Sequence, residues 1–269
     1  MKRLLFLLSL FLVLQIAQAQ VTTNEGSGLA PTYPSLADAI TALNAATITS
    51  PVIITLTGAE TAPTGGYSIT ASGDATNTIV IQGNSSVITA SAALTVGALN
   101  DAVFKIIGGD FITIQNFTMQ ENGANAVNTP PASNNMTEFG VAVFYATAID
   151  GSQNITLKNN TISLNRVYAN TFGIYINATH TATAMSVSAT ATGASGGNHN
   201  LAITGNAISN VNNGIIVIGP TAAVDMNDGV VIGGSLADAN TLSDFGTTGT
   251  FSGYANVSGT VNGILVRNT

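Results

Sequence analysis

Short runs of alternating apolar and polar residues recur along the chain after residue 50. The recurring unit reads apolar-x-apolar-x-[Asn or Gly], as in Ile155/Leu157/Asn159. The alternation predicts a short half-buried β-strand. Asn or Gly in the fifth place predicts a sharp corner, because these residues enter the left-handed backbone region at low cost. The expected corner residues are Gly83, Asn116, Asn159, Gly205, Gly234 and Asn268.

Other apolar runs extend this reading to most of the chain. Strands that begin with glycine lie between copies of the unit, for example at 140–146 and 173–177. The full set of expected strands is 51–58, 77–83, 102–109, 111–119, 140–146, 154–159, 173–177, 201–206, 214–219, 229–234 and 263–268.

One helix is expected, over 35–46. Ser35 has the side chain of an N-cap residue, and Asp38 follows three residues later as an approximate capping box. Leu36, Ala39, Ile40 and Leu43 fall on one face at helical spacing. This helix would cover the open first end of a stack of strands, as terminal units do in solenoid proteins.

The spacing of the copies predicts a coil. Successive second apolar positions lie 33, 43, 46, 29 and 34 residues apart. We interpret the intervals of 43 and 46 as two turns of about 22 residues each, a size typical of β-solenoid repeats. About ten turns, with parallel strands about 4.8 Å apart, would form a rod roughly 50 Å long. Asparagines at equivalent corners would form amide ladders.

A β-sandwich and a β-propeller are the alternative folds. Both folds are built from antiparallel hairpins. In a sequence, short Asn-Gly turns between adjacent strands would indicate such hairpins. Such signals occur at Asn213-Gly214 and Asn262-Gly263 but are otherwise scarce, so the coil is preferred.

The N-terminus has the pattern of a secretory signal peptide. Lys2 and Arg3 precede an apolar run, which ends at a small-x-small cleavage site. The alternative, a membrane anchor, is disfavoured because the run is short, and no span is expected after its removal. The expected organisation is a signal peptide at 1–19, an N-terminal segment with the helix at 20–50, and stacked strands at 51–269. The sequence stops in mid-motif, so we expect the stack to be incomplete there.

Composition narrows the classes of partner. After residue 19 the chain has four basic and thirteen acidic residues, a formal charge of −9, and no cysteine. Binding to nucleic acid is not expected, because phosphate contacts need clustered Lys and Arg. Only 7% of residues are charged, and abundant Thr, Ser and Asn suit the outer faces of an extracellular β-protein.

The helix and three strand segments also carry a family resemblance. The segments YPSLADAITALNAA, FITIQNFTM, NITLKNNTI and LAITGNAI resemble those of the pectate-lyase-like superfamily. The opening of the mature chain resembles large cell-surface β-helix proteins secreted by Bacteroidota. The resemblance implies an all-β, right-handed, single-stranded parallel β-helix with a short N-terminal capping helix. It also implies a secreted or cell-surface location.

Some members of that superfamily cleave acidic polysaccharides, so catalysis was considered. A lyase needs a cation and a base beside the uronate carboxylate, and a hydrolase needs paired carboxylates. The Asn-Thr-Asp, Gly-His-Gly and Arg-x-Lys motifs of the family's hydrolases do not occur. We therefore assign no catalytic residue and no cofactor.

No metal site is assigned either. His180 and His199 flank a low-complexity segment, but a metal usually needs three or four ligands. The stretch 225–229 resembles a shortened calcium loop that lacks the distal Glu, and we interpret it as a turn.

Three segments are expected to be inserted loops, at 120–138, 178–200 and 235–262. The last contains Phe245, Phe251 and Tyr254, which are candidates for stacking on sugar rings. The alternative is that these rings cover the edge of the core.

Three functional hypotheses follow. The leading one is a non-catalytic, adhesin-like scaffold that contacts extracellular polysaccharide or cell-surface glycan. The second is a polysaccharide lyase or glycoside hydrolase, with a groove that gathers at least two of Asp101, Asp110, Asp150, Lys105, Lys158 and Arg166. The third is a passive spacer.

Overall fold

The computed structural model describes most of the chain after residue 19. The described residues are 20–92, 94, 100–125, 136–168, 170–178, 189–193, 195–223, 225–246 and 261–269. The predicted signal peptide lies outside them. Within them the protein is mostly β, with one α-helix, α2 (Leu36–Ala45), and two short 3₁₀ helices, η1 (Gly26–Gly28) and η3 (Leu236–Asp238).

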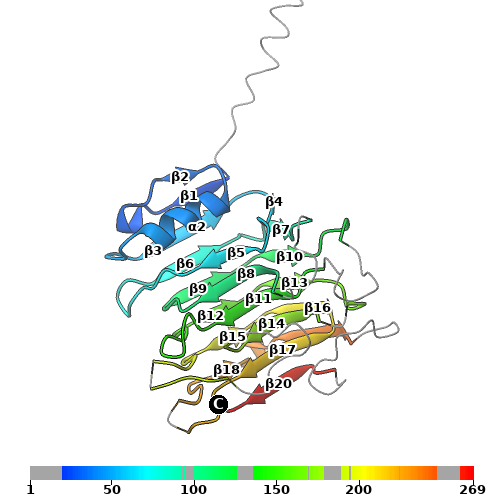
Figure 1. Ribbon diagram of the computed structural model, residues 1–269. Coiled ribbons are helices and arrows are strands. Elements are labelled where there is room, and N and C mark those ends of the chain that lie inside the picture. Colours follow the sequence, from blue (N-terminus) through cyan, green and yellow to red (C-terminus); the bar gives the residue numbers. More distant parts are fainter. Residues whose placement is uncertain are drawn as a thin grey trace, which may run out of the picture.

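The strands form three sheets, which we call A, B and C (Figure 1). Sheet A contains, in spatial order, β2 (Thr32–Tyr33), β1 (Val21–Thr23), β3 (Val52–Leu56), β6 (Ile79–Gln82), β9 (Ile112–Gln115), β12 (Thr156–Lys158), β15 (Ala202–Thr204) and β18 (Val231–Ile232). Sheet B contains β4 (Glu60–Thr61), β7 (Val87–Thr89), β10 (Thr118–Gln120), β13 (Thr161–Ser163), β16 (Ala207–Val211) and β19 (Thr241–Phe245). Sheet C contains β5 (Tyr67–Ile69), β8 (Ala102–Ile107), β11 (Phe139–Phe144), β14 (Phe172–Ile176), β17 (Asn213–Ile218) and β20 (Ile264–Arg267).

Strand direction follows the prediction of parallel stacking. Every pairing in sheets B and C is parallel. Sheet A is parallel from β3 to β18, while β1 pairs antiparallel with both β2 and β3. Equivalent strands from successive passages of the chain therefore lie side by side, which a sandwich of hairpins would not produce.

The chain passes from sheet A to sheet B to sheet C six times within the described residues. We call each passage a winding. The prediction of about ten turns was wrong, because Ile114, Leu157 and Ile203 are direct neighbours in sheet A. Intervals of 43 and 46 residues are thus single windings with extra residues at the corners, not pairs of short turns.

One strand lies inside a segment that was expected to be an inserted loop. β19 pairs in parallel with β16, with Thr241 opposite Ala207 and Ser243 opposite Ser209. Its residues are mostly exposed, so its own hydrophobic pattern is weak. The register of the neighbouring strand, not local periodicity, specifies this element.

The helix is confirmed where the sequence placed it. The Ser35 hydroxyl accepts a hydrogen bond from the Asp38 amide at 3.1 Å, and the face bearing Leu36, Ala39, Ile40 and Leu43 is buried. Asn44 donates to the Ser68 carbonyl at 2.8 Å, which ties the helix to β5. The helix therefore lies against the first winding, at the N-terminal end of the stack (Figure 1).

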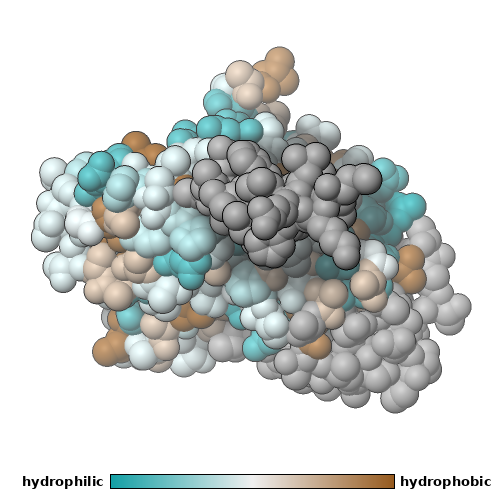
Figure 2. Space-filling view, turned by 90° about the horizontal axis from the view of Figure 1, so that it is seen from above, coloured by the Kyte–Doolittle hydropathy of each residue, from teal (hydrophilic) through white to brown (hydrophobic). Residues whose placement is uncertain are grey.

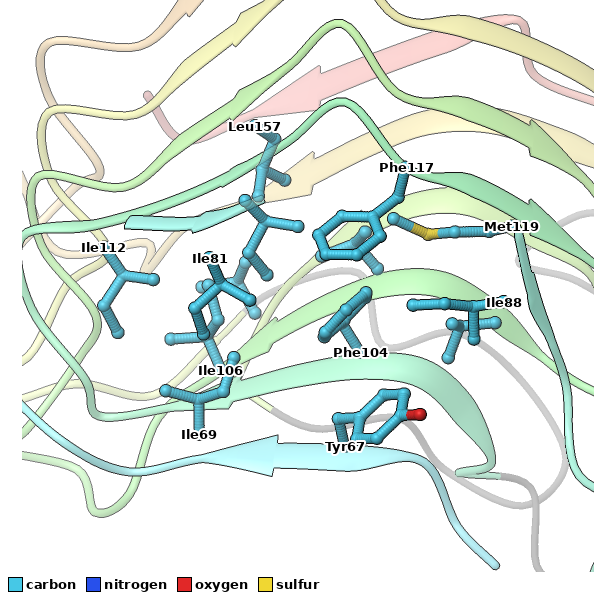
Figure 3. Packing of buried hydrophobic residues seen from close by; sticks show 14 of the residues in the cluster. Tyr67, Ile69, Ile81, Ile88, Phe104, Ile106, Ile112, Phe117, Met119 and Leu157 are labelled. Carbon is cyan, nitrogen blue, oxygen red and sulfur yellow. The ribbon is translucent and has the colours of Figure 1, made fainter. Parts of the chain in front are cut away.

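The interior is filled by columns of aliphatic and aromatic side chains (Figure 3). The rings of Tyr67 and Phe104 lie 5.1 Å apart, and those of Phe104 and Phe117 are also 5.1 Å apart. Ile88 and Met119 of sheet B complete this layer and are fully buried. Full burial of such side chains contributes about 1.5–3 kcal/mol each, which makes the columns the main source of stability.

Glycine is required where sheet C begins in each of three windings. A Cβ atom on Gly140 or Gly173 would lie 2.5 or 2.4 Å from Cγ2 of an isoleucine on sheet B, Ile162 or Ile208. Gly214 has the same relationship to Leu242, at 2.2 Å. Branched side chains of sheet B therefore pack on bare backbone of sheet C, which explains the strand type that begins with glycine.

An asparagine ladder joins the corners between sheets A and B. Oδ1 of Asn206 accepts from the backbone amide of Asn160 at 3.0 Å, and Oδ1 of Asn240 accepts from the backbone amide of Asn206 at 3.0 Å. Each side-chain amide also donates to a sheet A carbonyl, as Asn206 does to Leu157 at 2.9 Å. Amide ladders were expected at the corner residues, but this one uses Asn160 and Asn206, which follow the corner residues Asn159 and Gly205, and Asn240, which directly precedes β19.

Candidate functional site

The expected corner residues adopt two kinds of backbone. Asn116, Asn159, Gly205 and Asn268 have φ of 60°, 55°, 64° and 57°, in the left-handed region. Gly83 does not have positive φ; the bend there passes through Asn84 and Ser85, with φ of 43° and 66°. Gly234 has φ of 141°, outside the left-handed helical region, and follows Gly233 at 87°. Gly83 is therefore the one expected corner residue without positive φ, and the bend at Gly234 also includes Gly233.

Of the three aromatic candidates, only Phe245 lies within the described residues. Its position in sheet B is paired with Val211, which is fully buried, so the Phe245 ring continues an interior column. The ring is 43% exposed, and its Cζ atom would contact a Cβ atom on Gly263 at 3.4 Å. This position favours the alternative role, a ring that covers the edge of the core. Phe251 and Tyr254 lie outside the described residues.

The corner between sheets B and C gathers buried ionisable groups from several windings. We call Asp101, Lys105, Glu121, Glu138 and Tyr168 the loop-root cluster, because they flank the segments that connect the two sheets. The Glu121 carboxylate accepts from the Asn125 side-chain amide at 2.7 Å and from the Thr137 hydroxyl at 2.9 Å. It thereby holds together the two ends of the segment 126–136.

Glu138 lies at the centre of this cluster and is 2% exposed. The Tyr168 hydroxyl donates to one carboxylate oxygen at 2.9 Å, and the Asp101 backbone amide donates to the other at 2.8 Å. Burial raises the pKa of Glu138 well above its usual value, and the nearby charge of Asp101 raises it further. Glu138 is too deeply buried to touch a polysaccharide, so its role is to join windings.

Asp101 and Lys105 lie beside Gly65 of the first winding; Asp101 is 4% exposed and Lys105 is half-buried. A Cβ atom on Gly65 would lie 3.7 Å from Lys105 Nζ and 3.9 Å from Asp101 Oδ1. Burial raises the pKa of Asp101 to about 6, although Lys105 opposes the shift, and burial lowers the pKa of Lys105. Catalytic acids and bases have pKa values shifted in these directions, but the pKa values of structural ion pairs shift in the same way. The shifts alone therefore do not distinguish a catalytic pair from a structural one.

The other residues of the enzyme hypothesis lie elsewhere. Asp110 accepts from the Gln153 backbone amide at 2.7 Å, and burial and the charge of Asp150 raise its pKa. Lys158 lies on the outer side of β12 in sheet A. Arg166 pairs with Asp244 at 3.6 Å beside sheet B. Asp101 with Lys105, and Asp110 with Asp150, are therefore the pairs that the fold brings together.

The histidine and the calcium-like turn have structural contacts. His199 Nδ1 lies 2.6 Å from Asp228 Oδ1, and Oδ1 of Asn227 accepts from the Asn198 backbone amide at 2.9 Å. His180 lies outside the described residues. Across the part of the chain that is described, no three carboxylate or imidazole side chains are grouped closely enough to hold a metal ion.

A cleft lies between the helix and the first winding. It has a volume of about 260 Å³ and is lined by residues of α2, including Ile40 and Asn44, and by Pro63 and Tyr67. Seen along the stack from this end, the part of the face that grey atoms do not cover carries hydrophobic residues among polar ones (Figure 2). Isolated exposed apolar residues of this kind are normal and do not indicate a binding patch.

The outer side of sheet B has a different character. One position on each strand points away from the core and lies in a single column across all six strands. We call it the hydroxyl column; its members are Thr61, Thr89, Gln120, Ser163, Ser209 and Ser243. Neighbouring members are about 4.8 Å apart, the spacing of paired strands.

Comparison with protein-family models, curated proteins and solved structures found no match to this chain. In the described part of the chain, no helix has the length and apolar character needed to cross a bilayer.

Proposed function

We propose that the chain folds as a right-handed, single-stranded parallel β-helix with α2 as its N-terminal cap. Three observations support this proposal: the repeated order of sheets A, B and C, the parallel pairing between windings, and the constant register of the interior columns. An experimental structure that gave a left-handed path, or sheets that do not enclose a common core, would contradict it.

On this scaffold we propose a non-catalytic function in a secreted or cell-surface protein, namely contact with extracellular polysaccharide or cell-surface glycan. The observation that carries the proposal is the regular polar outer surface. On the outer side of sheet A the amides bond one another, because Gln115 donates to Gln82 at 2.9 Å and Gln82 donates to Thr55 at 3.0 Å. These groups are therefore less available to a ligand than the outer groups of sheet B. Sheet B carries the hydroxyl column. Fixed arrays of amides and hydroxyls on a rigid surface suit the hydroxyl groups of a sugar polymer.

A polysaccharide and glycan array, probed with the purified mature chain, tests this function. We expect retention on at least one polymer. The Phe251→Ala and Tyr254→Ala variants show whether these aromatic residues contribute to glycan binding. Phe245→Ala is the comparison variant, because it should lower the stability of the fold by removing a ring at the edge of the core. Absence of binding to every glycan would refute carbohydrate contact and would favour the spacer hypothesis.

A second candidate is the lyase or hydrolase activity of the resembling superfamily. The specific observation in its favour is the Asp101–Lys105 pair, with its opposed pKa shifts. Incubation with pectin and alginate, followed by the absorbance of unsaturated uronate products and by a reducing-sugar assay, tests it. Activity that disappears in Lys105→Met would establish catalysis at this pair. No product from either polymer would exclude it for these substrates.

A further inference from the structure

The hydroxyl column is continuous and solvent-facing. Its residues alternate with Ile88, Met119, Ile162 and Ile208, which are fully buried, so the column points away from the core. A second outward column runs beside it. Its members are Val87, Thr118, Thr161, Ala207 and Thr241. The outer side of sheet B is therefore an uncharged strip that crosses every winding. Most of its side chains carry a hydroxyl group; Gln120, Val87 and Ala207 do not.

Among the described residues, three hydroxyls of the column have no hydrogen-bonding partner. Gln120 donates to the Thr89 hydroxyl at 3.0 Å. The hydroxyls of Ser163, Ser209 and Ser243 make no side-chain hydrogen bond with any described residue. They can both donate and accept, as the hydroxyl groups of a sugar do.

Charge is absent from the strip and present only at its margins. None of the outward positions of β7, β10, β13 or β16 is charged. At one margin Arg166 is already paired with Asp244. At the first strand, the Glu60 carboxylate accepts from the Leu36 backbone amide at 3.0 Å and serves the helix. Sheet A differs, because Lys158 lies in its outer column, and Ile53 and Val231 are 38% and 47% exposed.

We propose that the outer side of sheet B is the glycan-contacting surface and that it takes an uncharged, extended polysaccharide lying along the stack, across the strands. This inference rests on the carbohydrate-contacting function proposed above and specifies its site and ligand class. In an extended β-linked polymer alternate pyranose rings are turned over, so the same hydroxyl groups recur on one side at every second ring. Such a repeat can meet every second winding, at about 10 Å, which is twice the spacing of paired strands.

Two physical reasons favour a neutral polymer over an acidic one. The strip offers no cation to pair with a uronate carboxylate, and the mature chain carries a formal charge of −9, which repels polyanions. Each neutral hydrogen bond contributes only about 0.5–1.5 kcal/mol net, so affinity must come from many windings at once. Binding should therefore grow with polymer length and be weak for mono- and disaccharides.

The test is co-sedimentation of the mature chain with microcrystalline cellulose, β-chitin and insoluble xylan, alongside binding to immobilised polygalacturonate. The sheet B variant is Thr161→Val/Ser163→Ala/Ser209→Ala. The matched control on sheet A is Thr113→Val/Thr156→Val/Thr204→Val. Circular dichroism and urea unfolding confirm that both variants fold. We expect at least one neutral polymer to bind, and the sheet B variant to lose about tenfold or more in affinity while the control retains it.

The outcomes separate the two proposals. Binding to polygalacturonate alone, or a larger loss in the sheet A control than in the sheet B variant, overturns the inference but leaves carbohydrate contact standing. Failure to bind any polymer here or on the array removes both. Selective loss in the sheet B variant on a neutral polymer supports both.

Discussion

The side-chain amide of Asn160 donates to Oδ1 of Asn206 at 3.1 Å, although 46 residues separate the two along the chain. Both residues are 1% exposed, and each belongs to a different winding. The contact fixes the alignment of one winding on the next, because a shift of one residue would leave buried amide groups without partners.

Replacing Asn206 tests this relationship. Asn206→Ala removes the acceptor for the Asn160 amides and the donor to the Leu157 carbonyl. Each buried group left unsatisfied costs about 1–3 kcal/mol, so we expect the free energy of unfolding in urea to fall by at least about 2 kcal/mol. The exposed Ser243→Ala should change it by less than about 0.5 kcal/mol. Equal effects would show that the ladder does not stabilise the stack.

Gly205 tests the corner conformation. A side chain at φ of 64° costs about 1–2 kcal/mol, and a Cβ atom would also lie 2.3 Å from Asn159 Oδ1. We expect Gly205→Ala to lower the free energy of unfolding by more than this backbone cost alone. Asn159→Gly alone should leave the free energy of unfolding nearly unchanged. In the double variant Asn159→Gly/Gly205→Ala it should relieve only the clash with the Asn159 side chain. Thermal and urea unfolding of the three variants distinguish the two contributions.

The contact between Gly173 and Ile208 predicts a coupled pair of substitutions. Gly173→Ala places a methyl group against Ile208 Cγ2 and should destabilise the fold by about 1–3 kcal/mol. Ile208→Ala leaves a cavity and should cost about 2–5 kcal/mol. Because the new methyl group partly fills that cavity, the double variant should be more stable than the sum of the single effects predicts, by about 0.5 kcal/mol or more. Strict additivity would mean that the two positions do not pack together.

The loop-root cluster predicts a pH dependence of stability. The pKa of Glu138 is higher in the folded chain than its usual 4.5, so its protonated form favours folding. The contribution of Glu138 to the free energy of unfolding is therefore fully present below pH 4.5. It is lost as the pH rises through the pKa of Glu138 in the folded chain. Asp101 adds a further loss of stability as the pH rises from its usual pKa of 3.8 to its folded-state pKa of about 6. Urea unfolding between pH 4 and 8, at fixed ionic strength, should show this decline.

Glu138→Gln isolates the larger contribution. Gln has nearly the same shape and does not ionise, so this variant should lose less stability than the native chain as pH rises. Asp101→Asn removes the other titration and should alter only the lower part of the curve. A Glu138→Gln variant that follows the native pH profile would contradict the assignment to Glu138.

The sequence predicted the helix and the longer strands, but it did not predict the two- and three-residue strands β4, β5 and β7. The helix needed only Ser35 and one apolar face, and the strand around Ile112 and Ile114 needed only alternation before Asn116. β19 was missed because its residues are exposed and its strand form depends on pairing with β16. The number of windings was also wrong, because spacing along the chain does not distinguish a long corner from a second turn.

The loop-root cluster was only partly visible in the sequence. Asp101 and Glu138 each directly precede a strand of sheet C, and aligning the starts of β8 and β11 would have placed them in neighbouring windings. The contribution of Tyr168 has no such signal, because it reaches Glu138 from a connecting segment. The pKa shifts depend on burial, and burial depends on how the windings pack against one another. The sequence of a single winding therefore does not predict them.

The unequal length of the windings has a practical consequence. Ile54 to Ile81 spans 27 residues and Leu157 to Ile203 spans 46, yet all four lie in one aligned row of sheet A. Extra polypeptide is accommodated at the bends without disturbing its neighbours. Foreign peptides grafted at these bends should therefore be displayed while the framework keeps its form, and natural variation in length there should not require a new fold.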